Sequence, residues 1–396
     1  MNPPTRWHDP ETQPSLRVLE GVMRLFGARL RRSDPRFSLL RDALMQGDPL
    51  ADAVAELLHE HASARELFDA ALEHGIDAVP DAPPALRALF DELDRDPPWL
   101  DRSVLRVATD TMLRMGVGTT YALGFASLMS GYLSAGGVKP LAATGALTRM
   151  AKRRLAETNK FVCDVMTSGD VSRFSAGWKT TLRVRIMHAV IRKRLHESPT
   201  WKDDAWGTPI NQHDMAGTNL QFSIVYIAGL AALGHLLSRE EREALMHLWR
   251  YVGSLIGVRA DLLPTSFAEG LELTWIYTLT EEGPDDDSRA LANALVGAFE
   301  GRLPGRAGSL AGKIEGGFLV GYSRFILGKS ASDGLRLPDG AWKYAPLVVL
   351  PARVAVESLR RLAPGGRARA VDRGRRRVEA EAALTLEGRP ATFTPP

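Results

Sequence analysis

Apolar residues recur three and four positions apart along most of the chain, which is the spacing of a helix with one buried face. The pattern predicts helices over 51–60, 65–73, 84–93 and 104–115. Clusters of Pro and Asp at 79–84 and 96–99 separate them, as expected of linkers and helix starts. Alternating runs of β-branched residues are scarce. The predicted fold class is therefore all-α.

Two further helices, 146–166 and 178–195, carry polar groups on faces that are otherwise apolar. In the first, the apolar stripe is interrupted at mid-length by Arg154, Glu157 and Thr158. Burying such groups is costly unless they are paired. Arg154 and Glu157, three residues apart, would also suit a simple ion pair at the protein surface.

In the second helix, His188 lies on the buried stripe, with Arg185 three residues before it and Arg192 four residues after it. The other members of the stripe are Thr181, Val184, Ile191 and Leu195. A histidine on an apolar face is most often a satisfied core residue. A haem, however, needs an imidazole from an apolar wall, and Arg185 or Arg192 could serve its propionates. The pattern is compatible with haem without deciding for it.

Composition narrows the class of protein. The chain has 396 residues, 45% hydrophobic and 24% charged, which is ordinary for a soluble globular protein. A net charge of +3 excludes a basic surface throughout, although nine arginines lie between Arg353 and Arg377. Such a run can contact phosphates or anionic lipid. Because no aromatic residues are interleaved with it, a solvated helix is favoured and no nucleic-acid partner is predicted.

Cysteine usage and the apolar runs bear on location. The single Cys163 excludes an intramolecular disulfide and suits a reducing compartment. The first residues show no export signal, and the apolar runs at 121–133 and 224–237 fall short of a membrane span or contain a histidine. We therefore expect a cytoplasmic protein with no integral membrane segment.

The chain divides provisionally into an N-terminal helical segment (1–95), a central core (96–350) and an Arg-rich C-terminal extension (351–396).

Three short motifs match no known catalytic or metal-binding pattern. The glycines of 116–120 lack the spacing and lysine of a phosphate loop and favour helix packing, and His59 and His61 are two apart, which suits no helical metal site. His213–Asp214 favours loop structure, although it could reach a pocket.

Seven segments in order resemble the family of haem b oxygenases that includes the latex-clearing proteins (rubber oxygenases) and the MpaB-type oxygenases. The segments are 47–53, 98–101, 131–132, 139–145, 153–158, 184–192 and 206–212. The resemblance covers roughly residues 40 to 350. It implies a globin-like helical core with additional N- and C-terminal helices.

The resemblance also implies roles for individual residues. His188 would be the proximal ligand of haem b, the metal ligand of the site, with Arg192 near the haem one turn beyond it. Arg154 and Thr158 would lie over the oxygen-binding face. Arg324 matches a further arginine of the pocket less closely.

At one position the chain departs from the rubber oxygenases, which carry a lysine where this chain has Glu157. A carboxyl group there would suit general acid–base chemistry, its pKa set by burial and by Arg154. The departure makes cleavage of rubber itself doubtful.

The resulting expectation is an enzyme, a haem-dependent oxygenase with dioxygen as co-substrate. It would act on a small apolar unsaturated molecule such as an isoprenoid, by oxygen insertion or double-bond cleavage. A peroxide-using haem enzyme and a non-catalytic haem-binding or gas-sensing protein are the alternatives. The sequence predicts no oligomeric state.

Overall fold

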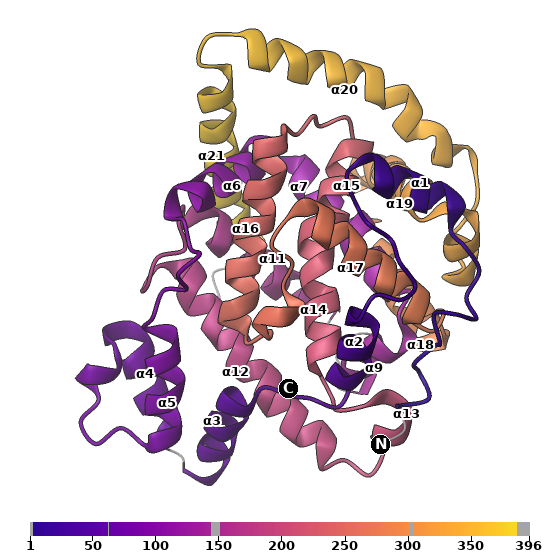
Figure 1. The fold of residues 1–396 in the computed structure, drawn as a ribbon. Helices are drawn as coiled ribbons and strands as arrows, with labels where there is room; N and C mark the ends of the chain where they lie inside the picture. The colour runs from indigo at the N-terminus through magenta and orange to yellow at the C-terminus, as the bar shows by residue number, and fades with distance from the viewer. Residues whose placement is uncertain (1–2, 62, 144–150, 301–304, 386–396) are drawn as a thin grey trace.

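The computed structural model describes residues 3–61, 63–143, 151–300 and 305–385. Every regular element in these ranges is a helix, which confirms the all-α prediction (Figure 1). The first part of the chain forms α1 (Arg17–Leu25), α2 (Arg36–Ala43), α3 (Pro49–Glu60), α4 (Ala64–His74), η1 (Ile76–Ala78), α5 (Pro84–Leu93) and α6 (Arg102–Met115).

The central part follows in a second series of helices. They are α7 (Val117–Tyr121), η2 (Ala122–Leu128), α8 (Met129–Gly131), α9 (Ala135–Ala143), α11 (Ala151–Thr167), α12 (Ala176–His196), α13 (Asp203–Trp206), α14 (Gln212–Leu220), η3 (Gln221–Val225), α15 (Tyr226–Ala232) and α16 (Arg239–Ile256). The remaining elements are η4 (Ala260–Leu262), α17 (Phe267–Thr280), α18 (Asp286–Glu300), α19 (Gly305–Gly334), η5 (Ala341–Tyr344), α20 (Ala345–Leu362) and α21 (Gly366–Thr385).

The six helices predicted from periodicity all form, as α3 to α6, α11 and α12. Their starts have local chemical causes. The Asp48 side chain accepts the Ala51 N–H at the start of α3, and Asp101 accepts two N–H groups at the start of α6. Ser175 caps α12 in the same way. These caps satisfy backbone donors that a helix leaves unpaired in its first turn.

Helix α12 occupies the junction between the N-terminal helices and the core. It packs against α3 on one side and against α11 and α16 on the other. In Figure 1, α3, α4 and α5 lie together at the lower left, and α12 runs from them into the body of the protein. The three-part division of the chain remains a prediction, but the N-terminal helices do not all pack together, because α1 and α2 lie on α17.

The Arg-rich C-terminal part is helical and attached to the core. Helix α21 packs on α6 and α11, burying Ala370 and Val378. Helix α20 is held through Glu357, which pairs with the buried Arg114 of α6. Arg114 also pairs with Glu241 of α16 at 2.7 Å, so the three helices share one buried charge cluster.

The glycines of 116–120 serve packing, as expected. Gly116 ends α6 with a φ of +56°, a conformation that favours glycine. At Gly118 a Cβ would collide with the ring of His235, which lies against the glycine backbone. No phosphate-binding role is needed to account for either residue.

Among the described residues, one continuous helical stretch, Gln212–Ala232, is long and apolar enough to cross a membrane. It comprises α14, η3 and α15, and 56% of its most apolar window is buried inside the protein. A core helix has these properties as well.

We expect the protein to lose stability as the pH is lowered, because His235 is buried. Burial and, to a smaller extent, the positive charges of Arg353, Arg114 and Arg360 together lower its pKa to about 4. A histidine in the unfolded chain has a pKa of about 6.5, so the unfolded state binds the proton first as the pH falls. The stabilisation is complete above that pH and is lost as the pH falls towards 4.

We therefore expect His235→Gln to lose less stability than the wild type between pH 7 and pH 5, by about 2 kcal/mol. Urea unfolding at the two pH values measures the difference. His196→Gln is the matched control, since the His196 side chain is 61% exposed. An equal loss in His235→Gln and wild type would contradict the assignment.

Candidate functional site

His188 lies at the middle of α12 with a ring nitrogen that no group satisfies. Its Nδ1 is buried and has no hydrogen-bond partner, although the residue as a whole is partly exposed. Burial, followed by the charge of Arg192, lowers the pKa of His188 to about 4. The imidazole is therefore neutral near pH 7, which is the form that binds a metal. An orphaned buried nitrogen is costly, so this histidine is not the satisfied core residue that periodicity alone favours.

An ion pair fixes α12 one turn before His188. The Arg185 guanidinium, 3% exposed, donates from Nε and Nη2 to the two carboxylate oxygens of Asp48 at 2.7 and 3.0 Å. Its Nη1 contacts Glu92 of α5 at 3.0 Å. Burial alone would lower the pKa of Arg185, but the Asp48 carboxylate outweighs it and the pKa is raised. Asp48 also caps α3, so one carboxylate joins the start of one helix to the middle of another.

A second ion pair fixes α12 one turn after His188. Arg192 pairs with Asp52 of α3 and donates to the carbonyls of Pro209 and Ile210, at 3.1 Å from Nε and 2.9 Å from Nη2 respectively. Burial raises the pKa of the Asp52 carboxyl despite this pairing. Arg192 is 5% exposed, so its charge must be balanced inside the protein, and Asp52 supplies the opposite charge.

Close backbone approach holds these groups together. Gly257, with a φ of +91°, leaves no room for a Cβ beside the Asp48 carboxylate. Gln212 donates to the carbonyls of Gly47 and Gly257, each at 2.9 Å. Three of the segments that resemble the oxygenase family, 47–53, 184–192 and 206–212, thus meet around α12.

These contacts give Arg185 and Arg192 a role that sequence reasoning missed. Both arginines hold α12 against α3, whereas the sequence suggested partners for haem propionates. The propionate role remains a prediction, and the observed carboxylate partners do not favour it. The missed signal was in the sequence, where Asp48 and Asp52 are spaced four apart and can face one helix.

Helix α11 packs against α12 and carries the predicted distal residues. Glu157 is buried, at 6% exposure, whereas Thr158 is exposed. The two side chains therefore do not share one buried stripe, because neighbouring residues point about 100° apart on a helix. Burial also excludes a surface ion pair for Glu157. The side chain of Arg154 lies outside the described part of the structure, so the roles of Arg154 and Thr158 remain predictions.

Arg324 lies in another part of the molecule. It is on α19, which packs on α18, η2, η5 and α20. Its guanidinium is 4% exposed, pairs with Asp333 at 2.7 Å and donates to the Leu337 carbonyl at 2.8 Å. Its role as a pocket residue stays a prediction, and these contacts account for it as a residue that fixes the end of α19.

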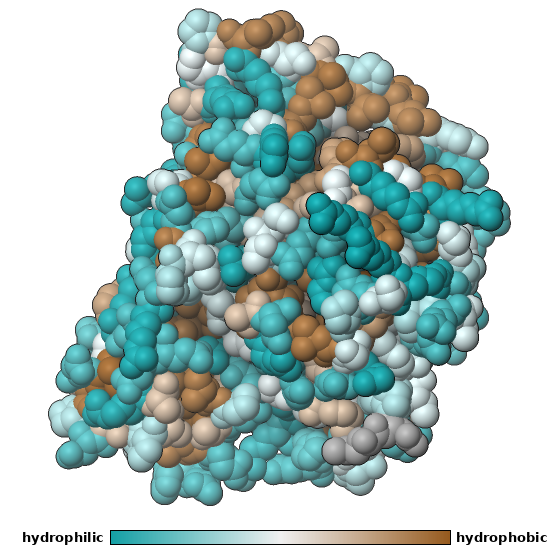
Figure 2. All heavy atoms as spheres, viewed as in Figure 1, coloured by the Kyte–Doolittle hydropathy of each residue, from teal (hydrophilic) through white to brown (hydrophobic). Residues whose placement is uncertain are grey.

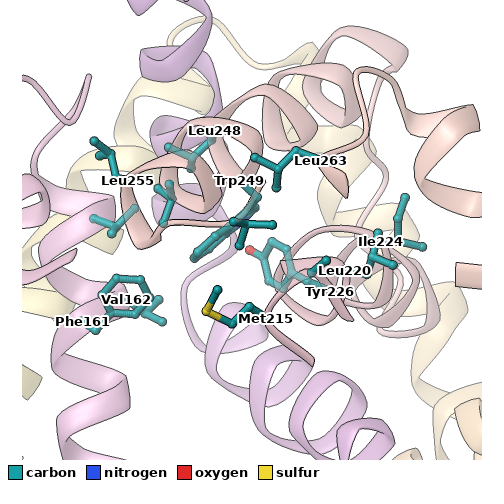
Figure 3. Close-up of a cluster of buried hydrophobic side chains, with 14 of the residues drawn as sticks. Phe161, Val162, Met215, Leu220, Ile224, Tyr226, Leu248, Trp249, Leu255 and Leu263 are labelled. Carbon is teal, nitrogen blue, oxygen red and sulfur yellow. The ribbon is translucent and has the colours of Figure 1, made fainter. Parts of the chain in front are cut away.

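An apolar wall lies between α11, α16 and the α14–α15 stretch (Figure 3). The rings of Phe222 and Trp249 stack with centroids 4.6 Å apart, and Phe161 of α11 lies 6.1 Å from Phe222. Met215, in the same cluster, contacts Arg192 through its sulfur at 4.0 Å. The apolar wall therefore extends to the helix that carries His188.

The His213–Asp214 pair belongs to a separate buried cluster. His213 Nε2 lies 2.5 Å from Glu281, and its Nδ1 lies 3.1 Å from the Leu40 carbonyl. Arg6 pairs with Asp214 at 2.7 Å and with Glu281 at 3.2 Å. His213, Asp214 and Glu281 are, among the described residues, one group close enough to hold a metal ion. Arg6 already supplies a cation to the two carboxylates, so an ion-pair network accounts for the cluster. The expectation of loop structure was wrong, because His213 and Asp214 lie in the first turn of α14.

Comparison with known proteins defines the family. The model for "ER-bound oxygenase mpaB/B'/Rubber oxygenase, catalytic domain" matches residues 113–363, more than half of the chain. The chain belongs to this family. The match includes α11 and α12 whole, so His188 and Glu157 both lie inside it.

Individual members of the MpaB/rubber oxygenase family are distant relatives. The rubber oxygenase of Streptomyces sp. (strain K30) is 25% identical over 201 residues, which are 47% of this chain and 46% of the relative. The match thus spans about half the length of that curated relative. A solved structure of latex clearing protein in the closed state superposes with a TM-score of 0.64 at 17% identity, covering 89% of this chain and 95% of the other. This likeness shows a shared all-helical fold.

Asp48→Asn should destabilise the protein, because it removes the buried counter-ion of Arg185 and leaves only the half-exposed Glu92. Asn still caps a helix, so the change isolates the charge. We expect the free energy of unfolding to fall by about 3–5 kcal/mol, measured by urea denaturation.

Two further variants make this test specific. Glu92→Gln, at a side chain 52% exposed, should cost less than about 1 kcal/mol. Asp48→Asn combined with Arg185→Met should recover part of the loss, since neither charge is left alone. A double variant less stable than the single one would argue against the ion pair as the cause.

Proposed function

We propose that the protein is a haem b-dependent oxygenase that uses dioxygen and acts on a small apolar, unsaturated molecule such as an isoprenoid. The observation that carries the proposal is His188. In a member of an oxygenase family, a neutral imidazole with an orphaned buried nitrogen lies on a helix beside an apolar wall. These features fit an imidazole that holds haem iron.

In this proposal the haem supplies the oxygen chemistry, and the protein supplies ligation, orientation and polarity. The Asp48 and Asp52 ion pairs fix α12 on both sides of His188, which keeps the imidazole in one orientation. A ligand held by a rigid helix needs no rearrangement when the cofactor binds. The packed rings of Phe161, Phe222 and Trp249 would exclude water from this side of α12.

Glu157 is the residue proposed to hold or deliver a proton. It is buried on α11, which packs on α12, and a carboxyl group can act as acid or base where the rubber oxygenases carry lysine. The same buried carboxyl favours a second candidate function, a peroxide-using haem enzyme. Rubber is named for the Streptomyces relative, and we do not propose it as the substrate here.

His188→Ala should abolish haem binding, because the other histidine of α12, His196, is exposed and cannot replace it. Titrating haem into the purified protein and recording the Soret band measures this. His196→Ala, on the same helix but exposed, should bind haem as the wild type does. A wild-type protein without a Soret band would remove the proposed function, and a band retained in His188→Ala would show that another residue is the ligand.

Glu157→Gln should lower turnover of a polyprenyl substrate by about 100-fold or more, the usual effect of removing a general acid or base. The rate is measured with dioxygen and with peroxide at equal haem content. Glu197→Gln, at a side chain 57% exposed, is the control. A loss confined to peroxide would favour the second candidate, and unchanged rates with both oxidants would contradict the proton role.

A further inference from the structure

Helix α1 lies on the protein with its apolar side facing outward. Val18 is 84% exposed and Leu25 is 86% exposed, and Val22 between them is 48% exposed. The inward face buries one apolar residue, Met23, together with Glu20, which accepts the Trp275 indole N–H at 3.1 Å. A surface helix of a soluble protein normally has the opposite arrangement, with apolar residues inward and charges outward.

Helix α20 repeats this arrangement far along the chain. Its buried residues are Pro346 and Glu357, the latter held by Arg114. Its exposed apolar residues are Leu347 at 51%, Val348 at 77%, Val356 at 46%, Leu359 at 66% and Leu362 at 81%. Each helix is thus fixed to the core through a carboxylate and leaves its apolar side chains in solvent.

The exposed charges on both helices are all positive. Glu20 and Glu357 are the acidic residues of α1 and α20, and both are buried. Arg17 and Arg24 of α1 and Arg353 of α20 are exposed. Helix α21, which follows α20, adds two exposed acidic residues, Asp372 and Glu379, and a larger number of exposed arginines: Arg367, Arg369, Arg373, Arg376 and Arg377. A surface that combines apolar rows with arginines is complementary to anionic headgroups over an apolar layer.

Aromatic residues lie at the start of α20. Trp342 and Tyr344 of η5 are 46% and 58% exposed. Such side chains favour the boundary between water and lipid, where the ring is partly buried and its polar atom stays hydrated. Figure 2 shows apolar surface gathered over α20 and around α1 on one face of the molecule.

We infer that α1 and α20 together form a docking surface for the headgroup layer of an anionic lipid bilayer. The valines and leucines enter the acyl boundary, and the arginines contact lipid phosphates. This is attachment to the surface, independent of the proposed function and of the buried stretch Gln212–Ala232.

Charge separates this occupant from two others. A second copy of the chain on the same face would bring arginine-rich helices against each other, which like charges oppose. An uncharged hydrocarbon polymer would offer no counter-charge to the exposed arginines. Anionic lipid satisfies both the apolar rows and the charges.

Flotation with lipid vesicles tests the inference on the full chain. The probes are vesicles of phosphatidylcholine alone and vesicles with about 30 mol% phosphatidylglycerol, each in about 50 mM and about 500 mM NaCl. We expect binding to anionic vesicles at low salt and at least about tenfold weaker binding without anionic lipid or at high salt. Binding should also shift the Trp fluorescence to shorter wavelength, and Trp342→Phe should reduce that shift.

The matched variant replaces exposed residues only, as Val18→Ser, Leu25→Ser, Val348→Ser and Leu362→Ser combined. It should lose vesicle binding at least about tenfold with an unchanged thermal midpoint, since these side chains make few contacts in the fold. Met45→Ser, at a residue 39% exposed and on neither helix, should bind like the wild type.

Four results would overturn the inference. One is a wild type that stays unbound with anionic vesicles at low salt, and another is a fourfold variant that binds as well as the wild type. A dimer in solution that the fourfold variant dissociates would assign the face to a second copy. Salt-independent binding to a polyisoprene emulsion, without binding to anionic vesicles, would assign it to an apolar polymer.

Discussion

The arrangement around His188 depends on neutralising two arginines that α12 carries into the interior. Arg185 and Arg192 are both nearly fully buried, and an unpaired charge at such a depth would be strongly destabilising. Asp48 and Asp52 supply the counter-charges from one helix, α3, so α3 must lie alongside α12 in one register. Gly257 must then be glycine to admit the Asp48 carboxylate, and the 206–212 loop must present its carbonyls to Arg192. The position of His188 follows from these charge requirements as much as from apolar packing.

Buried carboxylates also take part in holding the outer helices α1 and α20. Glu20 and Glu357 help to attach α1 and α20 to the body through buried polar contacts, beside the buried Met23 of α1. The hydrogen bonds of a buried carboxylate are directional, since each requires a donor at a particular place. Apolar faces need not then serve as the attachment and are left free for another purpose. In the core, ion pairs fix α12, and at the periphery buried carboxylates leave apolar side chains of α1 and α20 exposed.

Periodicity predicted the helices well because α3 to α6, α11 and α12 each have one buried face, and side-chain caps mark the starts of α3, α6 and α12. It placed His188 and Glu157 correctly as inward-facing residues. It failed for the partners of Arg185 and Arg192, because Asp48 lies 137 residues from Arg185 and only the tertiary fold joins them. It also grouped Thr158 with Glu157, although adjacent residues on a helix point in different directions. At α1 and α20 the amphipathic pattern was present, but the pattern does not say which face turns inward.

The cluster of Arg6, Asp214 and Glu281 ties the N-terminal segment to two helices much later in the chain. Arg6 is far earlier in the chain than Asp214 and Glu281, the two carboxylates with which it pairs. Gly136 lies against the Arg6 side chain, and a Cβ at that position would collide with it. Without Arg6, Asp214 and Glu281 would be neighbouring carboxylates with no guanidinium to balance them, so this part of the interior is complete only when Arg6 is in place.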